Sequence, residues 1–331
     1  MEILFVGAKG KMEMEKVPEA GYSIVGIDIA GYNRSSLIKN LTLPYKLIKS
    51  FMQVRKIFKS FSPQAAVGVG GYSSFPVLRY AQSQGIPTFI HESNSFAGKS
   101  NILLGKKATK IFTASDGMTK FFPSARLIHT GNPVRKIVVE NSITREEGLD
   151  FFGLDPKFTT VLVTGGSLGA KSMNEAIDSG VTSLLKNNIQ LIWQTGKSFA
   201  SQAAAHAVES KMIWTGQFIS KMEYAYAASD IVVSRSGSVL YELCAVKKPV
   251  IFVPYPHATE DHQTVNANNL VQKNAAIMIP DKDARNHLVP EILRLSNNKQ
   301  EQEILKNNIG KLAITDADDR IATEILKTID D

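Results

Sequence analysis

The chain has 331 residues, of which 44% are hydrophobic, and it carries a formal net charge of +7. This length is enough for two domains of ordinary size, and the composition is typical of a globular protein. The single cysteine, Cys244, excludes an internal disulfide and indicates a reducing compartment. No apolar run approaches the roughly 20 residues that cross a bilayer, and the opening MEILFVGAKGK predicts a short strand rather than a signal peptide.

The first part of the chain alternates short apolar segments with helical patterns. Strands are expected at residues 3–6, 23–27, 65–69, 88–91, 110–113 and 127–130. Strands of this length that are separated by helices predict a parallel sheet with helices on both faces.

The segment between Asp28 and Glu92 contains no acidic residue. Its basic residues, which alternate with apolar ones, are Arg34, Lys39, Lys46, Lys49, Arg55, Lys56, Lys59 and Arg79. A basic and apolar segment of this kind, here residues 34–61, is typical of a peripheral protein that meets an anionic membrane surface. Nucleic acid is an alternative partner, and the solvated face of a packed helix is a further interpretation. We favour the membrane and expect no nucleic acid.

The same alternation resumes after a polar stretch at residues 140–157, which is helical near 144–152. Strands are expected at 160–164, 190–194, 213–216, 230–234, 250–253 and 276–279, with helices between them, for example at 170–185, 220–228 and 263–272. The predicted fold class is α/β, with two Rossmann-like domains whose parallel sheets face each other across a cleft. The predicted divisions are a first domain at 1–136, a linker at 137–157, a second domain at 158–312 and a C-terminal helix at 313–331 that could pack back on the first domain.

A turn of small residues, S-R-S-G-S at 234–238, joins an apolar strand to a helix. Such a turn leaves unpaired backbone N–H groups that suit a phosphate. Glu242 lies one turn into the helix, where its carboxylate can accept both hydroxyls of a ribose. The alternative is an ordinary strand-to-helix turn with a solvent-facing glutamate.

A second turn, G-G-S-L-G-A at 165–170, follows the strand expected at 160–164 and opens a helix. Its glycines permit close backbone approach, and Ser167 adds a hydroxyl for a phosphate. The turn is neither G-x-G-x-x-G nor a Walker A loop, which argues against a dehydrogenase and against an ATPase. A structural turn without a ligand is the alternative.

Polar side chains end the strand expected at 88–91, where an open α/β sheet binds its ligands. His91 could act as a general base with Glu92 as its partner, and Asn94 lies beside them. The alternative is a histidine that is satisfied at the edge of the core. Arg135 follows the rigid G-N-P at 131–133 and could present its planar fork of donors to an anion, with a structural ion pair as the alternative.

The segment HATEDHQTVN at 257–266 resembles a cluster of metal ligands. Its spacing is wrong for H-E-x-x-H and the chain contains no second set of ligands, so we expect no metal. Gln263 and Asn266 instead present amides that suit sugar hydroxyls. Cys244 lies in the same helix as Glu242, and we expect it to be a packed apolar residue.

Six motifs, taken in order, resemble those of one family. They are G-V-G-G-Y-S-S-F-P, H-E-S-N-S-F-A-G, T-G-N-P-V-R, V-T-G-G-S-L-G-A, S-R-S-G-S…E and E-D-H-Q-T-V-N-A. The set resembles the MurG family of UDP-N-acetylglucosamine–N-acetylmuramyl-(pentapeptide) pyrophosphoryl-undecaprenol N-acetylglucosamine transferases. The resemblance implies a GT-B fold, no cofactor, no metal requirement and inversion at the sugar carbon. It also implies a peripheral protein whose first domain binds the lipid-linked acceptor at the cytoplasmic face of the cell membrane.

The resemblance further implies a donor site made of Asn94, Arg135, Ser167, Ile219, Glu242 and Gln263. Glu242 would bind the ribose diol, and the backbone near Ile219 would read uracil. The diphosphate would be held by Ser167 and the turn at 236–240, which includes Ser238. Gln263 with Asn266 would read the sugar. The implied activity is transfer of GlcNAc from UDP-GlcNAc to the C4 hydroxyl of lipid I, which forms lipid II in peptidoglycan synthesis. A nucleotide-sugar-binding protein of this fold without catalysis is the alternative.

The chain departs from the family's pattern at two places. Family members begin with a strand, a G-G-T-G-G-H loop and a helix, whereas the match of M-E-x-x-x-V-P-x-x-G-Y at 12–22 aligns Met1 with their second strand. We therefore expect a truncated, inactive fragment or a misplaced start codon, with exposed strand edges in the first sheet and the family's base histidine in the missing segment. The turn before Glu242 is also one residue shorter than the family's S-G-x-x-T-x-x-E and lacks its threonine.

Overall fold

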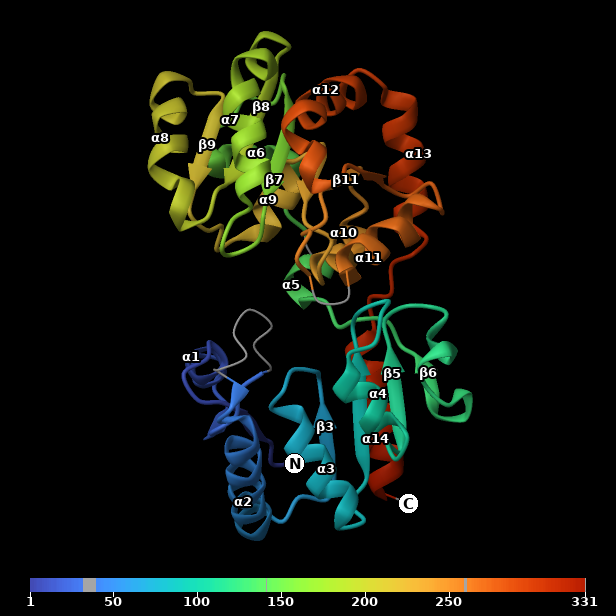
Figure 1. Ribbon diagram of the computed structural model, residues 1–331. Helices are drawn as coiled ribbons and strands as arrows, with labels where there is room; N and C mark the ends of the chain where they lie inside the picture. Colours follow the sequence, from blue (N-terminus) through green and yellow to red (C-terminus); the bar gives the residue numbers. More distant parts are fainter. Residues whose placement is uncertain (32–39, 141, 259–260, 331) are drawn as a thin grey trace. The chain divides into compact units, whose positions relative to one another are not determined.

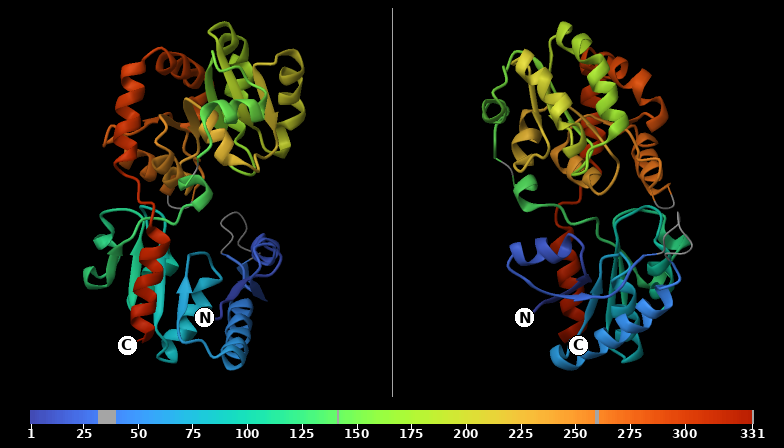
Figure 2. Two further views of the ribbon diagram at one scale, coloured as in Figure 1. Left: turned by 180° about the vertical axis from the view of Figure 1, so that it is seen from behind. Right: turned by 60° about the vertical axis from the view of Figure 1, so that its left-hand side comes forward.

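The structure, a computed structural model, describes residues 1–31, 40–140, 142–258 and 261–330 (Figure 1). Its contacts divide the chain into two units, Met1–Gly131 with Ala317–Asp331 and Asn132–Asp316. Each unit is built from parallel strands and helices, so the predicted α/β class is confirmed (Figure 2). None of the helices in the described stretches combines the length and the apolar character needed to cross a membrane.

The first unit contains two sheets. β1 (Leu4–Ala8) pairs in parallel with β2 (Ser23–Ile27). The other sheet is also parallel and has the order β3 (Ala66–Gly68), β4 (Thr88–Glu92), β5 (Lys110–Thr113) and β6 (Leu127–His129). The α-helices between these strands are α1 (Glu13–Glu19), α2 (Leu43–Phe61), α3 (Ser74–Ser83) and α4 (Lys99–Gly105).

One hydrophobic core joins these two sheets. Ile27 of β2, Val54 of α2 and Ile90 of β4 are fully buried in the same cluster. Within the described residues, β1 and β3 are each paired on one side only. Phe5 of β1 and Val67 of β3 are 39% and 46% exposed, although strands of parallel sheets are normally covered on both faces. Among the described residues, β1 and β3 are thus end strands whose side chains are in part exposed to solvent.

The C-terminal helix α14 (Ala317–Asp330) belongs to the first unit. Lys110 Nζ of β5 lies 2.6 Å from Glu324 Oε2 of this helix, and Ala317 at its start is buried. Figures 1 and 2 both show α14 alongside the four-stranded sheet. The end of the chain thus returns to the unit in which the chain begins.

The second unit is built on one parallel sheet with the order β12-β11-β10-β7-β8-β9. Its strands are β7 (Thr159–Thr164), β8 (Ile189–Gln194), β9 (Ile213–Gly216), β10 (Ile231–Ser234), β11 (Val250–Phe252) and β12 (Ile277–Met278). The chain crosses the sheet in one direction from β7 to β9 and in the other from β10 to β12. The strand order therefore reverses between β7 and β10, and a ligand-binding crevice is expected at the carboxyl ends of these strands.

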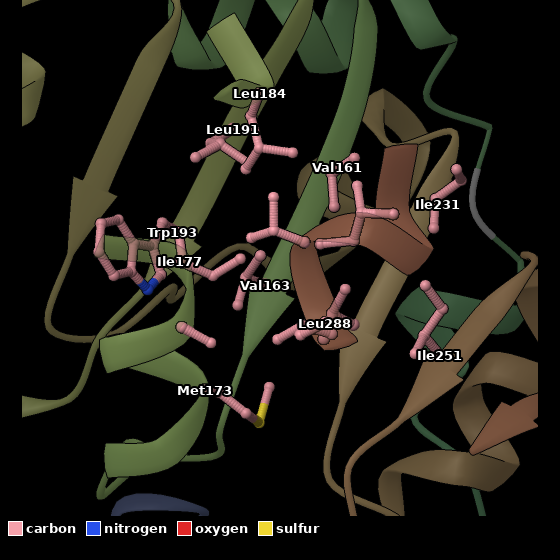
Figure 3. Packing of buried hydrophobic residues seen from close by; sticks show 14 of the residues in the cluster. Val161, Val163, Met173, Ile177, Leu184, Leu191, Trp193, Ile231, Ile251 and Leu288 are labelled. Atoms are coloured by element: carbon pink, nitrogen blue, oxygen red, sulfur yellow. The ribbon is translucent and has the colours of Figure 1, made fainter. Parts of the chain in front are cut away.

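Helices cover both faces of this sheet and bury two hydrophobic clusters. They are α5 (Lys136–Val139), α6 (Arg145–Phe152), α7 (Lys171–Lys186), α8 (Ala200–Glu209), α9 (Met222–Ala228), α10 (Val239–Val246), α11 (His262–Val271), α12 (Ala284–Ser296) and α13 (Lys299–Gly310). Figure 3 shows one cluster, in which Met173 and Ile177 of α7 lie with Val163 of β7. Burial of each such side chain stabilises the fold by about 1.5–3 kcal/mol. The packed sheet therefore fixes the positions of the loops at its carboxyl edge.

Residues 137–157, which the sequence predicts to be a linker, belong to the second unit. Within them, α6 begins with a capping box formed by Thr144 and Glu147. Arg145 pairs with Asp230 at 3.0 Å and so ties α6 to the strand that follows Asp230. The boundary between the units falls between residues 131 and 132 instead of at residue 136.

Candidate functional site

The candidate site lies at the carboxyl edge of the second sheet, where the strand order reverses. Thr164 ends β7, Ser234 ends β10, and these two residues lie opposite each other in the sheet. The loops that leave the two strands are residues 165–170 and 235–238, the turns that the sequence singles out. Doubly wound sheets bind nucleotides at this position. The topology therefore supports both turns as parts of one site.

The loop at 165–170 packs closely against the end of β8. Gly169 has φ +78°, and a Cβ at this position would lie 2.1 Å from Thr195 O. A residue with a side chain would therefore be both strained and in collision. Ser167 is exposed, and the adjacent Leu168 is 87% exposed. The loop presents its backbone and the Ser167 hydroxyl at the strand edge.

A buried amide connects this loop to the segment that carries Ile219. Gln194 at the end of β8 is 3% exposed, its Nε2 donates to Gly166 O at 2.9 Å, and its Oε1 accepts from Ile219 N at 2.9 Å. Gln194 therefore sets the spacing between the glycine loop and Ile219. The sequence analysis missed this residue, and its signal was a polar side chain at the carboxyl end of a buried strand.

The turn after β10 is held by the start of α11. Ser236 Oγ donates to Gln263 O at 2.7 Å, and Asn266 Nδ2 donates to Ser236 O at 3.1 Å. Asn266 is only 2% exposed, so its side chain supports the turn, whereas the sequence analysis expects it to face a sugar. Gln263 Oε1 accepts from Tyr255 N at 2.9 Å.

Arg235 is a second support of this turn. Its Nη1 donates to Val253 O at 2.8 Å and pairs with Asp281, and its guanidinium lies 5.6 Å from the centroid of the Tyr255 ring. Arg235 therefore ties the turn to the end of β11. Ser238, at the start of α10, remains exposed and makes no capping hydrogen bond with its side chain.

Glu242 of α10 binds two side chains. Arg135 forms a bidentate pair with it, because Nε donates to Oε1 at 2.7 Å and Nη2 donates to Oε2 at 3.0 Å. Tyr226 of α9 also donates its hydroxyl to Oε2 at 3.0 Å. Burial, followed by the charge of Glu242, raises the pKa of Tyr226 well above its usual range. The Tyr226 hydroxyl therefore keeps its proton and remains a donor.

His91 ends β4 in the first unit together with Glu92. His91 is 7% exposed, and its Nε2 lies 3.1 Å from Gly131 O. A carbonyl can only accept, so Nε2 carries the proton of the neutral ring. Burial lowers the pKa of His91, although the hydrogen bond to Gly131 acts in the opposite direction. A neutral imidazole with an unprotonated Nδ1 is the state that can accept a proton.

Glu92 organises the loop that follows β4. Its Oε1 accepts from the backbone N and from Nδ2 of Asn94, and its Oε2 accepts from Gly98 N and from Asn101 Nδ2. Glu92 is 3% exposed. Two of its four hydrogen bonds go to Asn94, so the position of Asn94 depends on this carboxylate.

Two further expectations concern cysteine and metal chemistry. Cys244 is buried in α10, and burial raises its pKa to about 12, so it is packed and unreactive as predicted. In the parts of the chain that the structure describes, no group of three or more His, Cys, Asp or Glu residues could hold a metal ion. Thr259 and Glu260 of the predicted 257–266 segment lie outside the described residues.

Known proteins resemble this chain over nearly its whole length. The Glycosyltransferase family 28 N-terminal domain matches residues 1–113, and the Glycosyltransferase family 28 C-terminal domain matches residues 160–321. A UDP-N-acetylglucosamine–N-acetylmuramyl-(pentapeptide) pyrophosphoryl-undecaprenol N-acetylglucosamine transferase of Parabacteroides distasonis is 48% identical over 332 residues, which cover 99% of this chain and 90% of that protein. A protein of the same name from Phocaeicola vulgatus is 48% identical over 333 residues, with 99% and 89% coverage. The crystal structure of MurG from Acinetobacter baumannii has a TM-score of 0.78 and 26% identity, over 98% of this chain and 91% of that one. The chain belongs to the MurG family.

Membership of the MurG family and the two α/β units confirm the predicted GT-B class. Seven of the predicted binding residues belong to the second unit, namely Arg135, Ser167, Ile219, Ser238, Glu242, Gln263 and Asn266. The first unit carries Asn94 with His91 and Glu92. The sequence analysis missed Gln194 and Tyr226, because the partner of each is distant along the chain.

Proposed function

We propose that the chain is a hexosyltransferase that moves GlcNAc from UDP-GlcNAc to the C4 hydroxyl of lipid I and so forms lipid II in peptidoglycan synthesis. The observation that carries this proposal is 48% identity, over 99% of the chain, to proteins named as the N-acetylglucosamine transferase of this family. The Glu242 carboxylate suits a ribose, and the turns at 165–170 and 235–238, where the strand order reverses, suit a diphosphate. Both features support the proposal. A binding protein without catalysis is not favoured, because these relatives are transferases.

In the proposed donor site, different elements of the second unit contact the parts of UDP-GlcNAc. Glu242 accepts hydrogen bonds from the two ribose hydroxyls, and the backbone around Ile219 recognises uracil. Ser167 and Ser238 bind the diphosphate together with the N–H groups of their turns, where the start of α10 adds a favourable dipole. Gln263 contacts the sugar. Asn266 contributes by holding the turn that contains Ser236.

Arg135 changes partner during donor binding in this proposal. In the free chain it neutralises Glu242 through two hydrogen bonds. A diphosphate carries more negative charge than one carboxylate and fits the same planar fork of donors. Arg135 therefore moves from Glu242 to the diphosphate, and the vacated carboxylate oxygens accept the ribose hydroxyls. The same cation then stabilises the charge that develops on departing UDP.

The proposed reaction is a single in-line displacement with inversion. The acceptor hydroxyl oxygen forms a bond to the anomeric carbon of GlcNAc while the bond from that carbon to the UDP oxygen breaks. The hydroxyl proton passes to a general base, and His91 is the candidate in this chain through its Nδ1. Glu92 positions Asn94 by accepting from its backbone N and its Nδ2, and two further donors hold the Glu92 carboxylate in place.

A transfer assay with radiolabelled UDP-GlcNAc and lipid I tests the function. The wild-type chain should release labelled lipid II, and Glu242→Ala should weaken UDP binding by roughly 1–3 kcal/mol, the scale of a lost charged hydrogen bond. Glu209→Ala, in an exposed position of α8, is the matched control and should leave both quantities unchanged. UDP binding without any transfer by the wild-type chain would favour the binding-protein alternative.

The proposed membrane contact rests on helix α2. Tyr45, Ile48 and Met52 are 67%, 64% and 62% exposed, and their spacing places them on one side of the helix. Lys56 and Lys59 are exposed further along the same helix. Exposed apolar side chains next to cations match the anionic surface of a membrane, where the apolar groups enter the headgroup region. Residues 34–39 of the predicted 34–61 segment lie outside the described residues.

Sedimentation with vesicles that contain anionic lipid tests this contact. Lys56→Glu together with Lys59→Glu should release the chain from the vesicles, because each basic residue near such a surface contributes about 1 kcal/mol. Lys186→Glu with Lys211→Glu makes the same change in net charge at exposed positions of the second unit and should leave binding intact. Equal binding of the two double variants would contradict the assignment to α2.

A further inference from the structure

One contact of Glu242 is not used by the proposed donor binding. A carboxylate offers about four acceptor positions on its two oxygens. Arg135 occupies one position on each oxygen, and the Tyr226 hydroxyl occupies another on Oε2. The two donors of Arg135 therefore reach the carboxylate as the two hydroxyls of a ribose would. When Arg135 leaves, one position opens on each oxygen.

Tyr226 stays in place when Arg135 leaves. Its side chain is 1% exposed and belongs to the same buried cluster as Leu243 and Phe252, whereas the Arg135 side chain is 50% exposed. The hydroxyl of Tyr226 thus remains on Oε2 in the free chain and with the donor bound. A tyrosine hydroxyl is protonated at neutral pH, and burial raises the pKa of Tyr226 further, so the hydroxyl stays a donor.

We infer that Tyr226 is a positioning residue that makes Glu242 selective for a ribose nucleotide over its 2′-deoxy analogue. This inference rests on the proposed role of Glu242 in binding the ribose. The terminal torsion of a glutamate is soft, so a carboxylate without an anchor rotates among many orientations. The Tyr226 hydroxyl selects the orientation in which both oxygens face the diol. Sites that hydrogen-bond a hydroxyl reject the analogue that lacks it, because their polar groups are then left unpaired.

Tyr226→Phe in the full chain tests the inference, since it removes one oxygen and leaves the packed ring. Calorimetry with UDP and with 2′-deoxy-UDP gives the discrimination ratio of each protein. The wild-type chain should prefer UDP by at least about tenfold, the scale of one charged hydrogen bond. Tyr226→Phe should reduce this ratio at least threefold and raise the KM for UDP-GlcNAc, with kcat changed less than twofold. An unchanged ratio would overturn the inference.

Tyr224→Phe is the matched control, because Tyr224 lies on the same helix and its ring packs at a tilt against Phe151. It should leave the ratio at its wild-type value. If Tyr226→Phe fails to fold, Glu242→Asp is the second variant. It withdraws the carboxylate from the Tyr226 hydroxyl and should also lower the ratio. In a Glu242→Ala background, Tyr226→Phe should not weaken UDP binding further, and additive losses would contradict the inference. Absence of UDP binding by the wild-type chain would instead overturn the proposed function.

Discussion

Replacing Arg135 by alanine should change the binding of uridine and of UDP in opposite directions. The pair between Arg135 and Glu242 must open before a ribose reaches the carboxylate, and with side chains 50% and 16% exposed this costs up to about 1 kcal/mol. Arg135→Ala removes the cost, so uridine should bind up to about fivefold more tightly. UDP also loses a charged contact of about 1.5–3 kcal/mol with its diphosphate. With the gain of 1 kcal/mol subtracted, its affinity should fall by about 2- to 30-fold.

Isothermal titration calorimetry at low salt measures both affinities, and low salt is chosen because screening weakens exposed pairs. Arg285→Ala serves as the control, since Arg285 is exposed on α12 of the same unit. It should leave the binding of uridine and of UDP unchanged. Weaker binding of uridine to Arg135→Ala would refute the reasoning, because it would mean that Arg135 supports the ribose site instead of occupying it.

Three other predictions follow from buried groups. Gln194→Ala leaves Ile219 N without its partner and removes one of the two donors to Gly166 O, so the free energy of unfolding should fall by about 1–3 kcal/mol. A denaturant titration without any loss would contradict the assigned role. Because burial lowers the pKa of His91 in the folded chain, the unfolded chain binds the proton more readily. The stability linked to His91 is therefore complete above its ordinary pKa of about 6.5 and is lost as the pH falls from there towards the folded pKa. His91→Asn should have a shallower decline in stability than the wild-type chain over this range, and identical declines would exclude this linkage. Cys244, with a pKa of about 12, should resist iodoacetamide at pH 8 in the folded chain and react in guanidinium chloride, as mass spectrometry can show.

The positions of the strands depend on local pattern, and the sequence predicts them well. Each of the twelve expected strands is present, with ends within two residues of the prediction. Short apolar runs bounded by turn residues are sufficient for this, since a central strand of a parallel sheet must be apolar on both faces. The limits of the units were harder to predict, because residues 137–157 are polar in sequence and yet dock through Arg145 on Asp230.

Some features of the candidate site can likewise be predicted from neighbouring residues, whereas others depend on contacts between residues that are distant in the chain. Its two turns are visible in the sequence, because a close approach such as that of Gly169 to Thr195 O needs glycine and leaves a recognisable run of small residues. The support of these turns is not visible there. Asn266 looks like a free amide in the sequence, whereas in the structure it is buried beneath Ser236.

The sequence by itself determined the α/β class, the family and the residue types that surround the proposed donor site. Only the tertiary structure decided which of these side chains touch. Arg135 and Glu242 are 107 residues apart along the chain and form a bidentate pair, and Tyr226 reaches the same carboxylate from a neighbouring helix. The physical reason is that turns and strands are specified by neighbouring residues, whereas the pairing of buried polar groups depends on how separate elements pack against one sheet. Glu242 was therefore predictable as an acceptor, and its two partners were not.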